Sequence, residues 1–204
     1  MSRIYLFFHT AQYGFLRLVG ILRTKWRMWG NGVQYSNCRT VGVPYIAVSG
    51  GGKIILGKNF QMNNEMEANQ IGYSTPCVLR AHGGTILIGD NVGMSQSALV
   101  ASGANITIGD YVKLGGGVKI YTTDFHSLDF QKRREPIIDM AERKYASVTI
   151  ENDCFIGAGT TILKGVHIGA RTIIGAGSII TNDIPCDCIA AGNPCRVIRM
   201  INKQ

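Results

Sequence analysis

Apolar residues recur at every sixth position along the C-terminal part of this chain. Each of six isoleucines is followed, four positions later, by a small or aliphatic residue. The isoleucines are Ile150, Ile156, Ile162, Ile168, Ile174 and Ile180, and the second set is Cys154, Thr160, Val166, Thr172, Ser178 and Ile184. A period of six fits neither an amphipathic helix nor an alternating strand, and it is typical of a solenoid of short parallel strands. Both sets are predicted to point inward.

Each hexad is expected to supply one strand and one corner, so that three hexads close one triangular turn. Residues 150–185 then form two turns. Ile150 is predicted to stack on Ile168, Ile156 on Ile174, and Ile162 on Ile180, at a strand spacing of ~4.8 Å. Since such units are stable only when several of them stack, roughly five to seven turns are expected in the whole chain.

The pattern continues upstream of the regular run. Residues 79–92 match residues 99–112 at an offset of 20, which is one turn of three hexads plus a short insert. Residues 54–60 resemble an earlier turn, and a loop is expected within 61–77. The fold class is therefore an all-β solenoid with three parts: an N-terminal basic amphipathic segment (1–45), a β-helix (46–185) with an excursion loop (121–147), and a C-terminal tail (186–204).

Positive charge is concentrated at the N-terminus. The net charge is +8, no Asp or Glu precedes Glu65, and residues 1–64 contain eight Lys or Arg. The remainder of the chain carries 13 basic and 13 acidic residues. This distribution indicates an anionic partner near the N-terminus, and it does not indicate a generally basic, nucleic-acid-binding protein.

Residues 1–30 are predicted to form an amphipathic helix, although Gly14 and Gly20 weaken it. Its apolar face contains Ile4, Phe8, Ala11, Phe15, Leu18, Leu22 and Trp29. Two interpretations stay open: the helix lies on an anionic membrane, or it caps the open end of the solenoid. The longest apolar run, 4–8, is too short to span a bilayer and short for a signal peptide. A cytoplasmic location, peripheral to the inner face of the membrane, is expected.

The six cysteines include no Cys-x-x-Cys pair. Cys154 occupies an inward hexad position and is interpreted as a packing residue. Cys186, Cys188 and Cys195 form a weak candidate for a metal site, because no histidine lies near them in sequence. Reduced thiols and no bound metal are expected.

Chemistry is expected where the solenoid is interrupted. Residues 124–144 carry ten charged residues, and His126 stands two positions after Asp124. A histidine can accept a proton from a hydroxyl or amine at neutral pH, and a neighbouring carboxylate can fix its tautomer. His126 is therefore a candidate general base, and Asp124 is predicted either to orient its ring or to bind the acceptor.

Two further segments carry a family resemblance. The hexads, followed by IIGAGSIITNDIP at 173–185 and AAGNPCRVIRMI at 190–201, resemble the hexapeptide-repeat acyltransferases, and the resemblance covers about residues 78–201. It is greatest to the galactoside and maltose O-acetyltransferases and to sugar acetyltransferases of surface-polysaccharide biosynthesis. The resemblance implies a left-handed parallel β-helix, a homotrimer with active sites between subunits, acetyl-CoA as co-substrate, and His126 as the base.

Other roles are implied residue by residue. The resemblance gives Ala158, Ala176, Thr181 and Asn182 contacts with pantetheine, and Arg196 and Arg199 contacts with CoA phosphates. Ala158 replaces a serine that is frequent in the family. Asp124 and Ser127 flank His126 where a Thr-His-Pro sequence is common, which favours a polysaccharide precursor over a simple galactoside. His167 is interpreted as an outward residue, and Lys132–Arg134 either approach an acidic acceptor or form a solvated face.

The expected function is transfer of acetyl from acetyl-CoA to a hydroxyl of a sugar or polysaccharide precursor. Three alternatives remain open at this point. One is acetylation of a xenobiotic or an amino group on the same scaffold. Another is a non-catalytic trimeric scaffold. The third is a γ-carbonic-anhydrase-like zinc enzyme, for which His82, His126 and His167 are widely separated in sequence.

Overall fold

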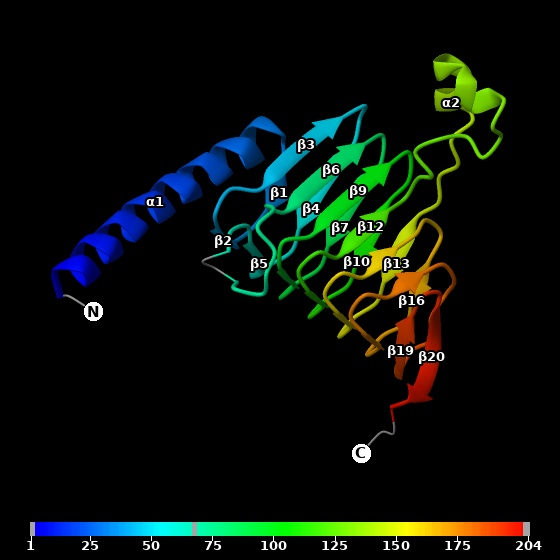
Figure 1. The fold of residues 1–204 in the computed structure, drawn as a ribbon. Helices are drawn as coiled ribbons and strands as arrows, with labels where there is room; N and C mark the ends of the chain where they lie inside the picture. Colours follow the sequence, from blue (N-terminus) through cyan, green and yellow to red (C-terminus); the bar gives the residue numbers. More distant parts are fainter. Residues whose placement is uncertain (1–2, 67–68, 202–204) are drawn as a thin grey trace.

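The chain coils into a three-sided prism that follows one long helix. The computed structural model describes residues 3–66 and 69–201, and the side chains of the helix from Gln12 onward. Helix α1 (Arg3–Gly30) extends outward from the first turn of the coil, and the C-terminal strands close the opposite end (Figure 1). Among the described residues, no helix combines the length and apolar content needed to cross a membrane.

Three sheets of parallel strands form the sides of the prism. Sheet A contains β1 (Gln34–Tyr35), β4 (Lys53–Leu56), β7 (Thr85–Ile88), β10 (Ile106–Ile108), β13 (Val148–Ile150) and β16 (His167–Ile168). Sheet B contains β2 (Cys38–Val41), β5 (Phe60–Asn63), β8 (Gly93–Met94), β11 (Lys113–Leu114), β14 (Phe155–Ile156), β17 (Ile173–Ile174), β19 (Cys188–Gly192) and β20 (Cys195–Met200). Sheet C contains β3 (Tyr45–Ser49), β6 (Val78–His82), β9 (Ala98–Ser102), β12 (Lys119–Tyr121), β15 (Thr161–Ile162) and β18 (Ile179–Ile180). Consecutive strands pass from A to B to C, and this order repeats six times.

The isoleucine ladder is confirmed in its predicted register. Ile150 pairs with Ile168, Ile156 with Ile174, and Ile162 with Ile180. The 20-residue offset is also confirmed, because the strands of residues 78–88 pair with those of residues 98–108. Parallel stacking of equivalent positions places identical side chains directly over one another, so one buried apolar column runs along each face of the core.

The second inward set is buried as well, including its polar members. Thr160, Thr172 and Ser178 are fully buried. Their hydroxyls donate to the carbonyl oxygens of Gly157 (2.8 Å), Pro185 (2.7 Å) and Gly175 (2.6 Å), respectively. Small hydroxyl residues fit this position because each one satisfies a corner carbonyl without leaving an unpaired buried group. Cys154 is buried in the same way and donates to the carbonyl of Gly169.

The predicted boundaries need two corrections. The coil begins at Gln34 and not at residue 46, because β1 pairs with β4, β2 with β5 and β3 with β6, all in parallel register. The C-terminal tail is not separate from the solenoid, since β19 pairs with β17 and β20 returns antiparallel to β19. The excursion occupies the residues between β12 and β13, and it contains a short 3-10 helix (Lys132–Arg134) and α2 (Pro136–Ala141).

Helix α1 contacts the coil through a face other than the predicted apolar one. Gly20, Thr24 and Met28 are buried against the first turn. Phe15, Leu18, Leu22 and Trp29 are exposed, whereas Ile4, Phe8 and Ala11 lie outside the described side chains. The capping interpretation therefore accounts for the last turns of α1 but not for its apolar face.

Candidate active site

The two ends of the excursion loop are hydrogen-bonded to each other where the loop leaves and rejoins the coil. Thr123 forms an antiparallel bridge with Tyr145, the Ala146 N–H donates to the Thr122 carbonyl (3.0 Å), and the Asp124 N–H donates to the Lys144 carbonyl (3.2 Å). Both ends of the loop are thereby tied to each other beside sheet C. These contacts hold His126, which follows them by a few residues, close to the rigid coil.

His126 is paired with a carboxylate from the far side of the same loop. Its Nδ1 lies 2.7 Å from Oδ2 of Asp139, which is on α2. The other oxygen of Asp139 accepts a hydrogen bond from the Ser127 N–H at 2.6 Å. Asp139 is buried while the His126 side chain is 66% exposed, so the carboxylate is fixed and the ring edge faces outward.

This pair has the electrostatics of an oriented base. The Ser127 N–H and the His126 ring hold the pKa of the Asp139 carboxyl below its usual range, so the group stays ionised. A carboxylate accepts only, so Nδ1 of the neutral ring carries the proton and Nε2 keeps its lone pair. Nε2 makes no hydrogen bond to any described residue. The ring can therefore accept a proton at Nε2 while Asp139 stabilises the resulting imidazolium.

Asp124 does not orient the ring, so the first of its two predicted roles is wrong. Its Oδ1 lies 3.2 Å from Nζ of Lys164, in the turn between β15 and β16. Its Oδ2 is buried and has no hydrogen-bond partner among the described residues. The ion pair attaches the loop to the next turn of the coil. The second carboxylate oxygen of Asp124 is a hydrogen-bond acceptor that these contacts do not use.

Asp139 is the functional residue that the sequence reasoning missed. It lies 13 positions after His126, so spacing gave no reason to join the two. One weak signal was available, because Asp139 interrupts an apolar segment, PIIDM, inside an otherwise charged loop. A lone carboxyl at such a position must find a partner when it is buried.

The basic segment Lys132–Arg134 is engaged within the loop. Lys132 pairs with Glu142 (3.0 Å), and Arg133 donates to the carbonyl oxygens of Ser127 (2.6 Å) and Leu128 (3.2 Å). The Arg134 guanidinium lies over the Phe130 ring at 5.5 Å. Arg133 in particular supports the backbone directly after His126, so this segment has a structural role in the site.

Small residues line the corner between sheets B and C, here called the BC corner. Ala158 and Ala176 stack there in successive turns. A Cβ at Gly115 would lie 2.7 Å from the Ala158 nitrogen, and one at Gly157 would lie 2.6 Å from the Ala176 nitrogen. Only glycine permits the turns to approach this closely. The amides of Ala158 and Ala176 donate to no described backbone carbonyl, so a ligand along this corner would meet open donors.

The two arginines of β20 lie on one face of that strand. Arg196 pairs with Ala191 and Arg199 with Ile189, two residues apart on β19, because an irregularity between these pairs takes up one extra residue. Both arginines are exposed. Ala191 in turn approaches Gly175 at the BC corner, where a Cβ on the glycine would lie 2.7 Å from that of Ala191. Arg196, opposite Ala191, therefore lies next to the BC corner in the turn that follows Ala176.

The predicted site residues fall at two different corners of the prism. His126, Asp124, Thr181 and Asn182 follow strands of sheet C and lie at the corner between sheets C and A, the CA corner. Ala158 and Ala176 lie at the BC corner, Arg196 lies next to it opposite Ala191, and Arg199 lies further back on sheet B, opposite Ile189. Thr181 and Asn182 are exposed and hydrogen-bonded to each other at 2.9 Å. Within one subunit, the candidate base therefore lies at a different place on the prism from most of the candidate cofactor contacts.

The remaining described histidines have other partners. His167 points outward, as predicted, and its Nε2 lies 2.8 Å from Oε1 of Glu151. His82 contacts the Ser49 hydroxyl at 2.9 Å. Within residues 3–66 and 69–201, no group of three or more metal-ligating side chains is close enough to hold a metal ion.

Comparison with known proteins places this architecture in a family. The family "Bacterial transferase hexapeptide (six repeats)" matches residues 147–182. A provisionally named acetyltransferase of Staphylococcus aureus (strain MRSA252) is 32% identical over 152 residues, which cover 74% of this chain and 71% of that protein. The chain belongs to the hexapeptide-repeat acetyltransferases. Their left-handed parallel β-helix is the fold predicted from the sequence.

Other hexapeptide-repeat acetyltransferases are similar over comparable lengths. The galactoside O-acetyltransferase of Escherichia coli (strain K12) is 38% identical over 63% of this chain. The chain spans about 60% of the length of that enzyme and of a second curated relative. A solved hexapeptide-repeat acetyltransferase of Vibrio cholerae O1 biovar eltor, complexed with acetyl-CoA, is 25% identical, with a TM-score of 0.59 over 95% of this chain and 87% of that one.

Proposed function

We propose that this protein transfers acetyl from acetyl-CoA to a hydroxyl of a sugar or polysaccharide precursor, with His126 as general base. The observation that carries this proposal is the His126–Asp139 pair, whose Nε2 faces outward from a loop held on the rigid coil. The galactoside O-acetyltransferase relative and the acetyl-CoA complex of the V. cholerae structure support the donor and the acceptor class.

In the proposed reaction, Nε2 of His126 removes the acceptor hydroxyl proton as the acceptor oxygen attacks the thioester carbonyl. Asp139 stabilises the imidazolium that forms, since it lies 2.7 Å from Nδ1. Collapse of the tetrahedral adduct breaks the C–S bond, and the CoA thiolate recovers the proton from His126. The products are an acetyl ester and free CoA, and the base returns to its starting state.

The separation of the two corners supports a homotrimer. A base at the CA corner and a small-residue line at the BC corner cannot act on one thioester within a single chain. If the CA corner of one subunit faces the BC corner of its neighbour, a three-fold ring forms three complete sites. Asp124 lies next to such a site, and its carboxylate, whose side chain is 22% exposed, would accept a hydrogen bond from the carbohydrate acceptor.

The pantetheine arm is proposed to lie along Ala158 and Ala176, with Thr181 and Asn182 as further contacts. Small side chains keep this path open to backbone donors. Arg196 and Arg199 would pair with the phosphates of CoA, because guanidinium groups match phosphate oxygens in charge and geometry. Their common face on β20 supports a joint role.

Replacing Arg196 or Arg199 by glutamine should raise the KM for acetyl-CoA about tenfold, since a charge-assisted contact is lost. The value of kcat should stay nearly unchanged, because the lost contact would stabilise bound acetyl-CoA equally in the ground state and in the transition state. Steady-state kinetics measure both constants. Arg80→Gln, an exposed arginine on sheet C, is the matched control. Equal effects of all three variants on KM would contradict the phosphate assignment.

A panel of acceptors tests the proposed function itself. Purified protein should release CoA from acetyl-CoA in the presence of nucleotide-linked or lipid-linked sugars, and the product should be an ester that hydroxylamine cleaves. A hydroxylamine-stable product, or activity only toward amines or antibiotics, would instead support the alternative amino-group or xenobiotic enzyme. Absence of acetyl-CoA binding by calorimetry would support the non-catalytic scaffold.

A further inference from the structure

Five large apolar side chains on α1 form a stripe that none of the described residues covers. Each is more than half exposed, and the spacing of three or four residues places them on one helix face. The stripe consists of Phe15, Leu18, Leu22, Trp26 and Trp29. The rings of Trp26 and Trp29 lie 5.3 Å apart at its C-terminal end. Such a contiguous apolar face marks an interaction surface.

The opposite side of α1 is anchored on the coil. The Thr24 hydroxyl donates to the Gly42 carbonyl (3.3 Å), and Arg27 donates to the Pro44 carbonyl (2.5 Å). Met28 is 1% exposed. These contacts fix the direction of the stripe relative to the enzyme, and they leave the preceding turns of α1 free to lie against another surface (Figure 1).

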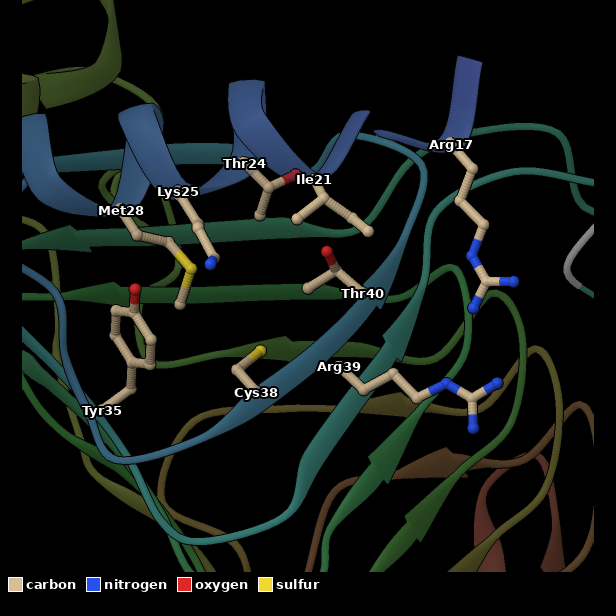
Figure 2. Close-up of a pocket in the computed structure, with 9 residues that line it drawn as sticks. All are labelled: Arg17, Ile21, Thr24, Lys25, Met28, Tyr35, Cys38, Arg39 and Thr40. Atoms are coloured by element: carbon tan, nitrogen blue, oxygen red, sulfur yellow. The ribbon is translucent and has the colours of Figure 1, made fainter. Parts of the chain in front are cut away.

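A cationic pocket lies between α1 and β2. Its volume is about 240 Å³. It is lined by Arg17, Ile21, Thr24, Lys25, Met28, Tyr35, Cys38, Arg39 and Thr40. Figure 2 shows Arg17 and Lys25 pointing from the helix toward the strand that carries Arg39 and Thr40. Figure 2 shows the guanidinium groups of Arg17 and Arg39 at one end of this pocket and the Lys25 ammonium toward the other, and none of the described lining residues is acidic.

The pocket and the stripe are neighbours on the helix. Lys25 is three residues after Leu22 and four before Trp29, so it flanks the stripe while lining the pocket. Phosphate oxygens are the natural partners of guanidinium groups that share one end of a pocket, as those of Arg17 and Arg39 do. A ligand that combines an apolar part with a phosphate would therefore satisfy both features at once.

We propose that α1 binds an anionic phospholipid surface, with the stripe among the acyl chains and a lipid phosphate at the end of the pocket where Arg17 and Arg39 lie. Charge distinguishes this partner from a second copy of the chain. Residues 1–64 contain eight basic and no acidic residues, so two α1 helices packed face to face would repel each other. Tryptophans at the end of an amphipathic helix fit the membrane interface.

Co-sedimentation of the full chain with lipid vesicles tests this proposal without any acetyl acceptor. Binding should be strong with phosphatidylcholine vesicles that contain phosphatidylglycerol, weak with phosphatidylcholine alone, and reduced at high salt. Leu18→Ser should weaken binding on the order of tenfold, because an apolar contact with lipid is lost. Arg39→Gln should weaken it about fivefold, as expected for one cation near an anionic surface.

Each variant has a matched control. Leu16 is as exposed as Leu18 (56% each) but lies on another side of the helix, and Lys119 is an exposed cation on β12. Leu16→Ser and Lys119→Gln should bind vesicles like the original chain. Equal recovery with neutral and anionic vesicles would overturn the proposal.

Two other occupants would give different results. A change of oligomeric state in Leu18→Ser without lipid, measured by analytical ultracentrifugation, would assign the stripe to a second copy. Calorimetric binding of inorganic phosphate that Arg39→Gln abolishes, with unchanged vesicle binding, would assign the pocket to a soluble phosphate compound. Either result would overturn the lipid assignment and leave the proposed acetyl transfer untouched.

Discussion

Replacing His126 by alanine is expected to lower kcat by about 10²–10⁴-fold, the usual contribution of a general base. The side chain is 66% exposed, and it contributes no packing that the coil needs. The variant should therefore keep the thermal stability, the assembly and the acetyl-CoA affinity of the original protein. Steady-state kinetics, sedimentation and calorimetry measure these properties separately.

His167→Ala is the matched control for this prediction. His167 is also exposed, and its Nε2 lies 2.8 Å from Oε1 of Glu151. It differs from His126 in its place, because it lies on the outer face of β16 in sheet A. Its removal should leave kcat nearly unchanged. Near-original turnover in His126→Ala, or equal losses in both variants, would refute the assignment of His126 as the base.

The coil could be predicted from the sequence because its order is periodic. Each turn repeats the same two inward positions, so the register of Ile150 on Ile168 follows from counting residues. The first turn was missed because it lacks a hexad signal. Residues 34–45 contain no isoleucine, and their strands are recognisable only through their pairing with the second turn.

The candidate site could be predicted only in part. His126 was found because the interruption of the repeat concentrates charge in one loop. Its partner Asp139 was not found, and only the first of the two roles predicted for Asp124 is wrong, because a contact between residues 126 and 139 depends on how the loop folds back through α2 and not on any repeat. Likewise, Ala176 and Asn182 are only six residues apart in the sequence, but they lie at different corners of the prism, on either side of β18.

Helix α1 shows a related limit. The apolar face was predicted from helical spacing, and the exposed Phe15, Leu18, Leu22 and Trp29 follow it. The face that contacts the coil could not be predicted, because Gly20 and Thr24 carry little apolar surface. Close approach of the backbone and the side-chain hydrogen bonds of Thr24 and Arg27 contribute to this contact, and neither produces a hydrophobic pattern; Met28 is its one fully buried apolar side chain among those described.

Asp139→Asn is expected to lower kcat by about 10²–10³-fold with an unchanged KM for acetyl-CoA, because the tautomer of His126 would be lost. The amide oxygen can still accept the Ser127 N–H, so the loop should keep its fold. The amide NH₂ would then donate to Nδ1 of His126, and the ring would carry its proton on Nε2, where no proton can be accepted. The Ser127 N–H and the His126 ring hold the pKa of the Asp139 carboxyl below its usual range, so the original protein has a carboxylate here at neutral pH.

Comparison with Asp124→Asn separates positioning of the ring from attachment of the loop. Asp124 pairs with Lys164 and not with His126, so its replacement should affect the acceptor KM more than kcat. Asp139→Glu should recover part of the lost rate, because a carboxylate again faces Nδ1, whereas a purely structural role of Asp139 would favour the nearly isosteric asparagine. A larger loss of kcat in Asp124→Asn than in Asp139→Asn would return the orienting role to Asp124.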